Sequence, residues 1–175
     1  MRVRYIFIAL MSMLVGCGGD ADIEGIKQGF ADNKSSFERL YLMIKEDTSA
    51  IPCFSVGADH IGEYWRHNGK WNTNRNYERK ISLAKVLEEV GLSDQRYQEY
   101  LSLFEKTGSN RISYCPKDPS WARIIVHSSG LSVSGCLTSI NINGDQSVPV
   151  TDVKPSYSSE ITPLGAGWYI SHDCT

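Results

Sequence analysis

The chain has 175 residues, of which 18 are basic, 20 are acidic and 41% are hydrophobic. This length and composition favour one folded domain with a hydrophobic core over a disordered chain. Because no run of basic residues occurs, nucleic acid and anionic lipid surfaces are poor candidates for partners.

The first 16 residues have the layout of an export signal. Arg2 and Arg4 precede the apolar residues 5–15, and this run leads into Leu14-Val15-Gly16-Cys17. The run has the roughly 7 to 15 residues of a signal-peptide core and is shorter than the about 20 residues of a transmembrane helix. Residues 14–17 resemble the lipobox of bacterial lipoproteins, which implies cleavage before Cys17 and a lipid on that cysteine. An ordinary secretory signal with a chance cysteine is the alternative.

Cleavage before Cys17 defines the domain organisation. We expect residues 1–16 to be the signal peptide, residues 17–25 the lipidated cysteine with a short tether, and residues 26–175 a single α+β domain. Losing the two signal arginines changes the net charge from −2 to about −4. A flexible tether of this length reaches roughly 15 Å, which keeps the domain near its membrane. Gly18 stands where Asp favours inner-membrane retention in enteric lipoproteins, so we favour the outer membrane over the inner membrane.

Three helices are predicted in the first two thirds of the chain. Ser82 can cap a helix that Gly91 closes, and Ser93 can cap the next, which Gly108 ends. Before them, one amphipathic helix is predicted over about residues 22–46. Its apolar residues recur at helical spacing and are Ile26, Phe30, Phe37, Leu40, Tyr41 and Ile44.

A hairpin is predicted between the first helix and the helix pair. The sequence His67-Asn68-Gly69-Lys70 lies between Tyr64-Trp65 and Trp71. Asn-Gly between aromatic flanks is a strong signal for a two-residue hairpin connection.

Beyond residue 110 the pattern changes to β-structure. The predicted strands are residues 112–114, 121–128, 131–142 and 168–172. Ser129-Gly130 is predicted as a two-residue connection, and a slip in alternation predicts a bulge near residues 135–139. Residues 145–163 are rich in Ser, Pro and Thr and are predicted as a surface loop. The expected fold is α+β, with the N-terminal helix and the helix pair packed on an antiparallel sheet of about 4–5 strands.

Three segments of the chain carry a second resemblance. Residues 92–100 (LSDQRYQEY), 128–135 (SSGLSVSG) and 163–169 (PLGAGWY) resemble a group of small uncharacterised bacterial lipoproteins. The likeness spans most of the mature chain, and its motifs are helix caps and turns. The resemblance implies neither an activity nor a catalytic residue, and the later cysteines are not part of its pattern.

Four cysteines remain once Cys17 is set aside. They are Cys53, Cys115, Cys136 and Cys174. An even number is typical of disulfides in an oxidising compartment, and the absence of a C-x-x-C motif argues against zinc or thioredoxin-like chemistry. Three pairings are open, and we favour Cys53–Cys115 with Cys136–Cys174, because the latter two lie in or beside predicted strands. Four buried free thiols are the alternative.

The densest polar cluster is residues 59–67 (DHIGEYWRH). His60, Glu63 and His67 would share a face only in a helix, and a metal site needs three or four converging ligands. The Asn-Gly turn and Gly62 argue against such a helix. We therefore expect no metal site and no cofactor other than the lipid on Cys17.

Catalytic motifs are not recognised elsewhere. Ser132 and Ser134 lie near glycines but fail the G-x-S-x-G pattern, which belongs to a strand-to-helix turn. His127 is predicted as a strand-edge histidine, and His172 as a residue at a strand end. The sequence contains no P-loop, dinucleotide fingerprint or H-E-x-x-H motif.

The candidate binding surface consists of Tyr64, Trp65, Arg66 and Trp71, which are residue types that dominate protein interfaces. Packing of the tryptophans as core is the alternative. We expect a membrane-anchored cell-envelope lipoprotein that binds a protein partner without catalysis, such as an immunity or inhibitor protein. A structural or assembly lipoprotein of an envelope complex and an enzyme with an unrecognised site are the alternatives.

Overall fold

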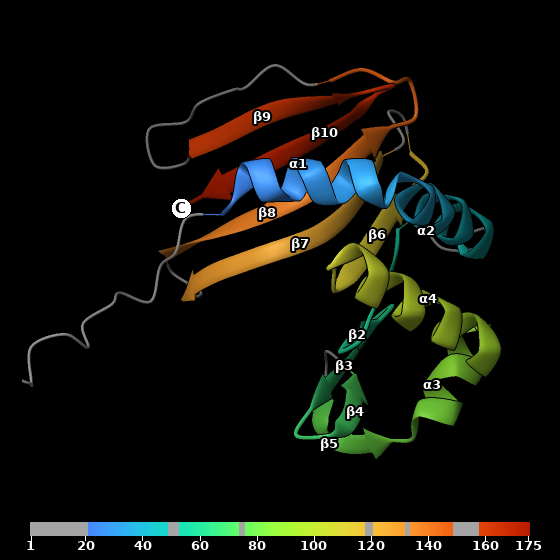
Figure 1. Cartoon of the computed structure of the whole chain (residues 1–175). Helices are drawn as coiled ribbons and strands as arrows, with labels where there is room; N and C mark the ends of the chain where they lie inside the picture. Colours follow the sequence, from blue (N-terminus) through green and yellow to red (C-terminus); the bar gives the residue numbers. More distant parts are fainter. Residues whose placement is uncertain (1–20, 49–52, 74–75, 118–120, 132–133, 149–157) are drawn as a thin grey trace, which may run out of the picture.

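The computed structural model describes residues 21–48, 53–73, 76–117, 121–131, 134–148 and 158–175. Within these residues, four helices and ten strands form an α+β fold (Figure 1). The predicted signal peptide and Cys17 lie outside the described residues. None of the described helices is long and apolar enough to cross a membrane.

The N-terminal amphipathic segment forms two helices where one was predicted. Helix α1 spans Ile23–Asp32 and α2 spans Lys34–Asp47. Asn33 separates them, and its side-chain amide donates a hydrogen bond of 3.1 Å to the carbonyl of Gly29. The backbone N–H of Asn33 donates to the same carbonyl at 3.1 Å, so both bonds close the end of α1. The φ of −118° at Asn33 then turns the chain out of the helical conformation, a break that the apolar spacing does not show. Helix α1 also begins inside residues 17–25, which were expected to be tether.

The helix pair forms as predicted. Helix α3 spans Leu83–Val90 and α4 spans Asp94–Thr107. Each serine cap accepts a hydrogen bond from the backbone N–H three residues later, and each helix ends at a glycine in the left-handed conformation. The capping residues, in chain order, are Ser82, Gly91, Ser93 and Gly108.

The strands form one antiparallel sheet. They are β1 (Phe54–Gly57), β2 (His60–Ile61), β3 (Tyr64–His67), β4 (Lys70–Thr73), β5 (Asn76–Ile81), β6 (Arg111–Cys115), β7 (Trp121–Leu131), β8 (Ser134–Asn143), β9 (Ser158–Gly165) and β10 (Trp168–Cys174). Their order across the sheet is β5-β4-β3-β2-β1-β6-β7-β8-β10-β9. The helix pair therefore connects β5, at one edge, to β6 in the middle of the sheet.

The expected sheet of about four to five strands is wrong, because the described residues form ten. Strand β2, for example, has only two residues and is too short to show the alternation of apolar and polar residues that is typical of a half-buried strand. Strand β9 begins within residues 145–163, which were predicted as a loop, and ends at Gly165. It is an edge strand, and an edge tolerates Pro163 because its outer side needs no hydrogen-bond donor.

The hairpin of β7 and β8 is longer than predicted. Residues 129–130 are paired strand residues, and the pairing continues to Leu131 and Ser134. The register shifts between Ile125 and His127. The extra residue therefore belongs to β7, whereas the bulge was predicted in β8.

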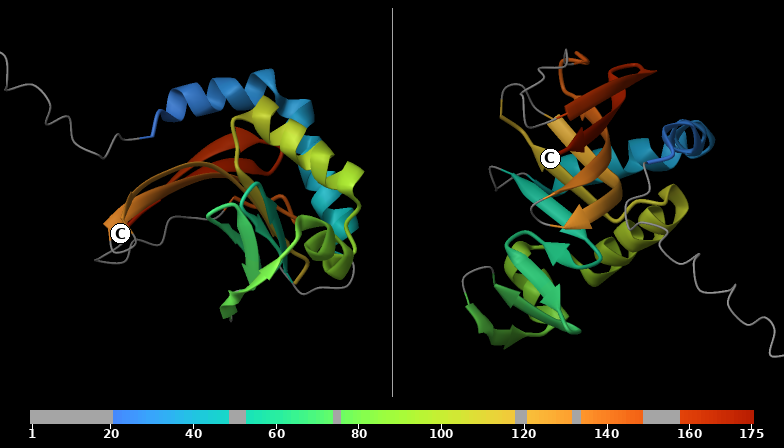
Figure 2. Two further views of the ribbon diagram at one scale, coloured as in Figure 1. Left: turned by 90° about the horizontal axis from the view of Figure 1, so that it is seen from below. Right: turned by 90° about the vertical axis from the view of Figure 1, so that its left-hand side faces the viewer.

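The helices α1, α2 and α4 lie on the same side of the curved sheet (Figure 2). Ile124, Ile140 and Ile170 form one row across β7, β8 and β10, and at most 1% of each is exposed. Burying a side chain of this size contributes about 1.5–3 kcal/mol. The core between the helices and the sheet thus holds the two layers together.

The favoured disulfide pairing is confirmed. Cys53 is bonded to Cys115, and Cys136 to Cys174. Cys136 and Cys174 lie opposite each other in β8 and β10. Closing loops of 62 and 38 residues stabilises the fold by about 4 kcal/mol each in the chain-entropy description.

Candidate functional site

The predicted binding surface lies on the hairpin of β3 and β4, at the end of the molecule far from α1 (Figure 1). Asn68 and Gly69 connect the strands and have φ values of 48° and 75°. Positive φ at both positions is what a type I′ connection requires. The predicted Asn-Gly hairpin is therefore present.

The four predicted surface residues lie on two faces of this hairpin. Arg66 is paired with Trp71, so these two share a face, and alternation along the strand adds Tyr64 to it. Trp65 lies on the other face. Arg66 is exposed and the first two aromatic residues of β3 are half-buried, whereas Trp71 is only 4% exposed. Trp71 is therefore a core residue, which was the alternative to its role in a binding surface.

A cleft of about 350 Å³ opens beside Arg66 and Trp71. This volume is at the small end of the roughly 300–1,000 Å³ of ligand pockets. Its walls come from the hairpin, from the start of α3 and from the first half of α4. The other lining residues are Ala58, Gly69, Lys70, Ile81, Ser82, Leu83, Tyr97, Gln98 and Leu101.

Arg66 gives the cleft an unbalanced positive charge. Among the residues that the structure describes, no carboxylate forms an ion pair with its guanidinium. Arg39, Arg96 and Arg111, in contrast, each pair with an acidic side chain. Arg66 is thus a cation available to a ligand.

Tyr97 supplies a buried polar wall of the cleft. Its hydroxyl donates to the carbonyl of Gly57 at 3.2 Å, with the carbonyl of Ala58 at 3.4 Å. Burial raises the pKa of Tyr97, although Arg66 opposes this shift. The hydroxyl therefore stays protonated at neutral pH, and its oxygen can accept a hydrogen bond from a ligand.

The opposite face of the hairpin carries a packed stack. The ring centroid of Trp65 lies 4.1 Å from that of His60, and Cζ of Arg111 lies 4.7 Å from the indole centroid. Arg111 also donates to Asp59 at 3.2 Å. Burial and then Arg111 lower the pKa of His60 to about 4, although Asp59 opposes them. His60 is therefore neutral at pH 7, and this face is built from packing contacts.

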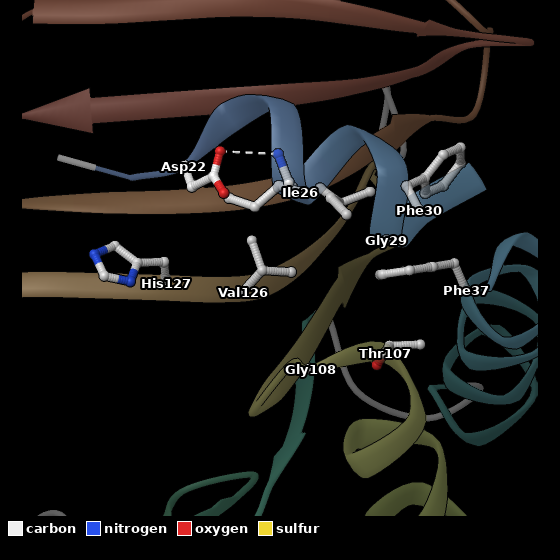
Figure 3. A pocket seen from close by; sticks show the side chains of 11 residues that line it. Asp22, Ile26, Gly29, Phe30, Phe37, Thr107, Gly108, Val126 and His127 are labelled. Carbon is white, nitrogen blue, oxygen red and sulfur yellow. Dashed lines mark hydrogen bonds between the residues drawn. The ribbon is translucent and has the colours of Figure 1, made fainter. Parts of the chain in front are cut away.

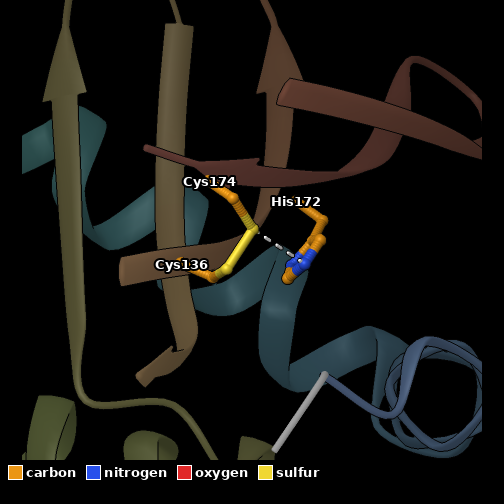
Figure 4. Close-up of side chains that lie close together, drawn as sticks. All are labelled: Cys136, His172 and Cys174. Atoms are coloured by element: carbon orange, nitrogen blue, oxygen red, sulfur yellow. Dashed lines mark hydrogen bonds between the residues drawn. A yellow bond between two sulfur atoms is a disulfide. The ribbon is translucent and has the colours of Figure 1, made fainter. Parts of the chain in front are cut away.

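The polar cluster at residues 59–67 does not assemble a metal site from His60, Glu63 and His67. The segment is strand and turn, with His60 buried in β2 and His67 exposed at the end of β3. One group of three metal-ligating side chains does converge among the described residues, with ligand atoms within 4.8 Å of one another. It consists of Cys136, His172 and Cys174 (Figure 4).

The other residues considered for chemistry are dispersed. Ser132 lies outside the described residues, and Ser134 begins β8 in a hairpin rather than at a strand-to-helix turn. His127 lies in β7, where its Nε2 is buried and has no hydrogen-bond partner among the described residues.

A second hollow of about 420 Å³ lies between α1, β7 and the end of α4 (Figure 3). Asp22 and His127 lie at its polar end, and the aromatic rings of Phe30 and Phe37 at the other. The remaining wall is largely apolar core. The cleft beside the hairpin is therefore the better candidate, since it contains two predicted surface residues, Trp71 and Arg66, and Arg66 has no ion pair among the described residues.

Sequence reasoning missed the contributions of α4 and of β10. Neither Tyr97 nor Gln98 was singled out as a site residue. Nothing in the sequence indicates that α4 packs beside the hairpin. For His172 the signal was its spacing from Cys174, because residues two apart in a strand share a face. Cys136 was predicted as the disulfide partner of Cys174, but the approach of His172 to that pair was not predicted.

No known family model matches this chain, and no curated protein or solved structure is significantly similar to it.

Proposed function

We propose that this chain is a lipid-anchored, non-catalytic binding protein of the bacterial cell envelope, and that its cleft binds an acidic segment of a partner protein. The single observation that carries the binding proposal is Arg66, an exposed cation that lines the cleft and has no acidic partner among the described residues.

The anchor is proposed from the lipobox-like residues 14–17. The likeness of residues 92–100, 128–135 and 163–169 to small bacterial lipoproteins supports the same proposal. The two disulfides suit an oxidising compartment such as the periplasm. Two or more acyl chains on Cys17 would hold the chain stably on a membrane.

The position of the cleft suits an anchored binding protein. Helix α1 follows the proposed anchor, and the β3–β4 hairpin lies at the opposite end of the molecule in each view (Figures 1 and 2). A partner can therefore reach the cleft without displacing the anchored end. A tether of few residues between Cys17 and Ile23 would keep this distal cleft at a limited height above the membrane.

The chemistry of the cleft suits a carboxylate. A guanidinium binds a carboxylate through two parallel hydrogen bonds, which adds geometric selectivity to the charge attraction. The Gln98 side-chain amide can donate a further hydrogen bond to the carboxylate, and the Tyr97 oxygen can accept one from a backbone N–H of the same segment. Leu101 offers an apolar wall for methylene groups. A glutamate residue displayed by a partner supplies a carboxylate, a backbone N–H and methylene groups for these three contacts.

Binding is tested with a fluorescein-labelled tetraglutamate peptide, with tetralysine as the peptide control. Fluorescence anisotropy at low salt should show that the glutamate peptide binds and that Arg66→Glu weakens binding about tenfold, or about 1.4 kcal/mol. Lys117→Glu makes the same charge change at an exposed site outside the cleft and should leave the affinity within about twofold. No binding by the wild type, or equal losses in the two variants, would contradict the proposal.

A further inference from the structure

Cys136, His172 and Cys174 form a compact cluster on one face of the sheet (Figure 4). The cysteines are directly opposite each other in β8 and β10 and are bonded. Nε2 of His172 lies 3.3 Å from Sγ of Cys174. All three residues are partly exposed, so a reagent in solution can reach them.

The imidazole of His172 is held in place by Thr138. Nδ1 of His172 lies 2.9 Å from Oγ1 of Thr138, whose side chain is fully buried. When Nδ1–H donates this bond, the lone pair of Nε2 faces the sulfur atoms. Metal-bound histidines are oriented in the same way, by a hydrogen bond from the ring nitrogen that does not bind the metal.

We propose that reduction of the Cys136–Cys174 disulfide turns this cluster into a zinc site, in which the two thiolates and Nε2 of His172 bind the metal and a fourth position stays open. Zn²⁺ prefers this set of sulfur and nitrogen ligands in tetrahedral geometry. With Zn–S near 2.3 Å and Zn–N near 2.1 Å, the sulfur atoms must separate to roughly 3.8 Å, while a nitrogen–sulfur distance of roughly 3.5 Å is close to the one already present.

The reaction is balanced by a dithiol reductant. The dithiol gives two electrons and two protons and is itself oxidised to a disulfide, the Cys136–Cys174 bond breaks, and two thiols form. Zn²⁺ then binds and releases both thiol protons to solvent. The disulfide and the zinc site use the same sulfur atoms, so the two states exclude each other and metal binding is controlled by redox state.

The sheet keeps the ligands close together when the disulfide opens. Seven residue pairs join β8 to β10 between Ile142–Trp168 and Cys136–Cys174. These pairs hold the two cysteines opposite each other without the covalent bond. Cys53 and Cys115 provide an internal control, because no histidine or carboxylate among the described residues joins them in a metal-ligating group.

The test uses the purified mature protein, reduced with a phosphine in the absence of oxygen and then incubated with Zn²⁺. After removal of free metal, elemental analysis should find about one Zn²⁺ per reduced chain and essentially none per oxidised chain. Cys53→Ser/Cys115→Ser should keep the metal, whereas Cys136→Ser/Cys174→Ser should lose it. Far-UV circular dichroism checks that each protein remains folded.

The role of His172 is tested by competition with a chromophoric zinc chelator. His172→Gln should weaken zinc binding at least tenfold. Thiolate-to-cobalt charge-transfer absorption in Co²⁺-loaded protein should be present in the reduced wild type and absent from Cys136→Ser/Cys174→Ser. Each of three results would overturn the proposal. They are reduced wild-type protein that binds no zinc, zinc binding that is lost in Cys53→Ser/Cys115→Ser, and an unchanged zinc affinity in His172→Gln.

Discussion

Oδ2 of Asp47 accepts a hydrogen bond of 3.0 Å from Nε of Arg96 and thereby joins the end of α2 to the first turn of α4. The hydroxyl of Tyr100 donates to the same oxygen at 2.7 Å. Burial alone lowers the pKa of Arg96, but the hydrogen bonds to Asp47 and Glu46 outweigh it and raise this pKa. Helices α2 and α4 are therefore linked by a charged pair that is largely shielded from water.

Removing this carboxylate should destabilise the fold. Asp47→Ala leaves the buried hydroxyl of Tyr100 without its acceptor and weakens the fixation of Arg96, so the free energy of unfolding should fall by about 2–3 kcal/mol. Glu38→Ala is the control, because it removes an exposed pair with Lys34 and should cost about 0.5 kcal/mol or less. Urea denaturation measures the free energy of unfolding of both variants. Equal losses would show that the bonds of Asp47 stabilise the fold no more than an exposed ion pair does.

The buried His60 predicts a loss of stability in acid. Its pKa is about 4 in the folded chain and 6.5 as an ordinary histidine. Between these values the unfolded chain binds a proton that the folded chain does not bind. The stabilisation is therefore complete above pH 6.5 and is lost as the pH falls toward 4.

After allowance for screening by solvent, this loss should be about 2 kcal/mol. The measurement compares the free energy of unfolding at pH 7.5 and pH 4.5 in the wild type and in His60→Gln, in which the difference should shrink by that amount. His67→Gln removes an exposed histidine from the same hairpin and serves as the control. A pH dependence that is unchanged in His60→Gln would rule out this role.

Two glycines should respond to alanine in opposite directions. Gly167 has a φ of +80°, and a Cβ there would lie 2.8 Å from Cα of Gln146, so Gly167→Ala should cost about 2 kcal/mol or more. Gly29 lies in α1 with no atom within 4 Å of an added Cβ, so Gly29→Ala should stabilise the chain by about 0.5–1 kcal/mol. Thermal unfolding of the two variants should shift to lower and higher temperature respectively, and shifts of the same sign would contradict this account.

The proposed anchor predicts the behaviour of Cys17→Ser. Without the thiol no lipid can be attached, so the variant should lose labelling by radioactive palmitate and leave the membrane fraction. Gly18→Asp should keep the label and, in a host that sorts by this position, move from the outer to the inner membrane. Continued partition of Cys17→Ser into detergent would refute the anchor.

Sequence predicted the parts of the fold that depend on neighbouring residues. Ser93 and Gly108 mark the ends of α4 because capping bonds form within three or four residues. Asn68-Gly69 likewise determines its hairpin through its own backbone conformation. The Asn33 break was missed, since apolar spacing continues on both sides of it and the side-chain bond that closes α1 depends on local geometry.

The number of strands in the sheet could not be predicted from neighbouring residues. Strand β2 is held by its neighbours rather than by its own pattern, and β9 consists of residues that are common in loops. Only some residues of the candidate site were predicted from the sequence. Arg66 and Trp71 stood out by residue type, whereas Tyr97 and Gln98 join them only because α4 packs beside the hairpin.

The most direct test of the binding account is to map the tetraglutamate peptide on the protein by two-dimensional ¹H–¹⁵N NMR. Titration should shift the signals of Arg66, Gln98 and Leu101 and the indole N–H of Trp71, and these shifts should vanish in Arg66→Glu. Shifts that gather elsewhere, for example along β9, or that persist unchanged in Arg66→Glu, would contradict the claim that this cleft is the binding site.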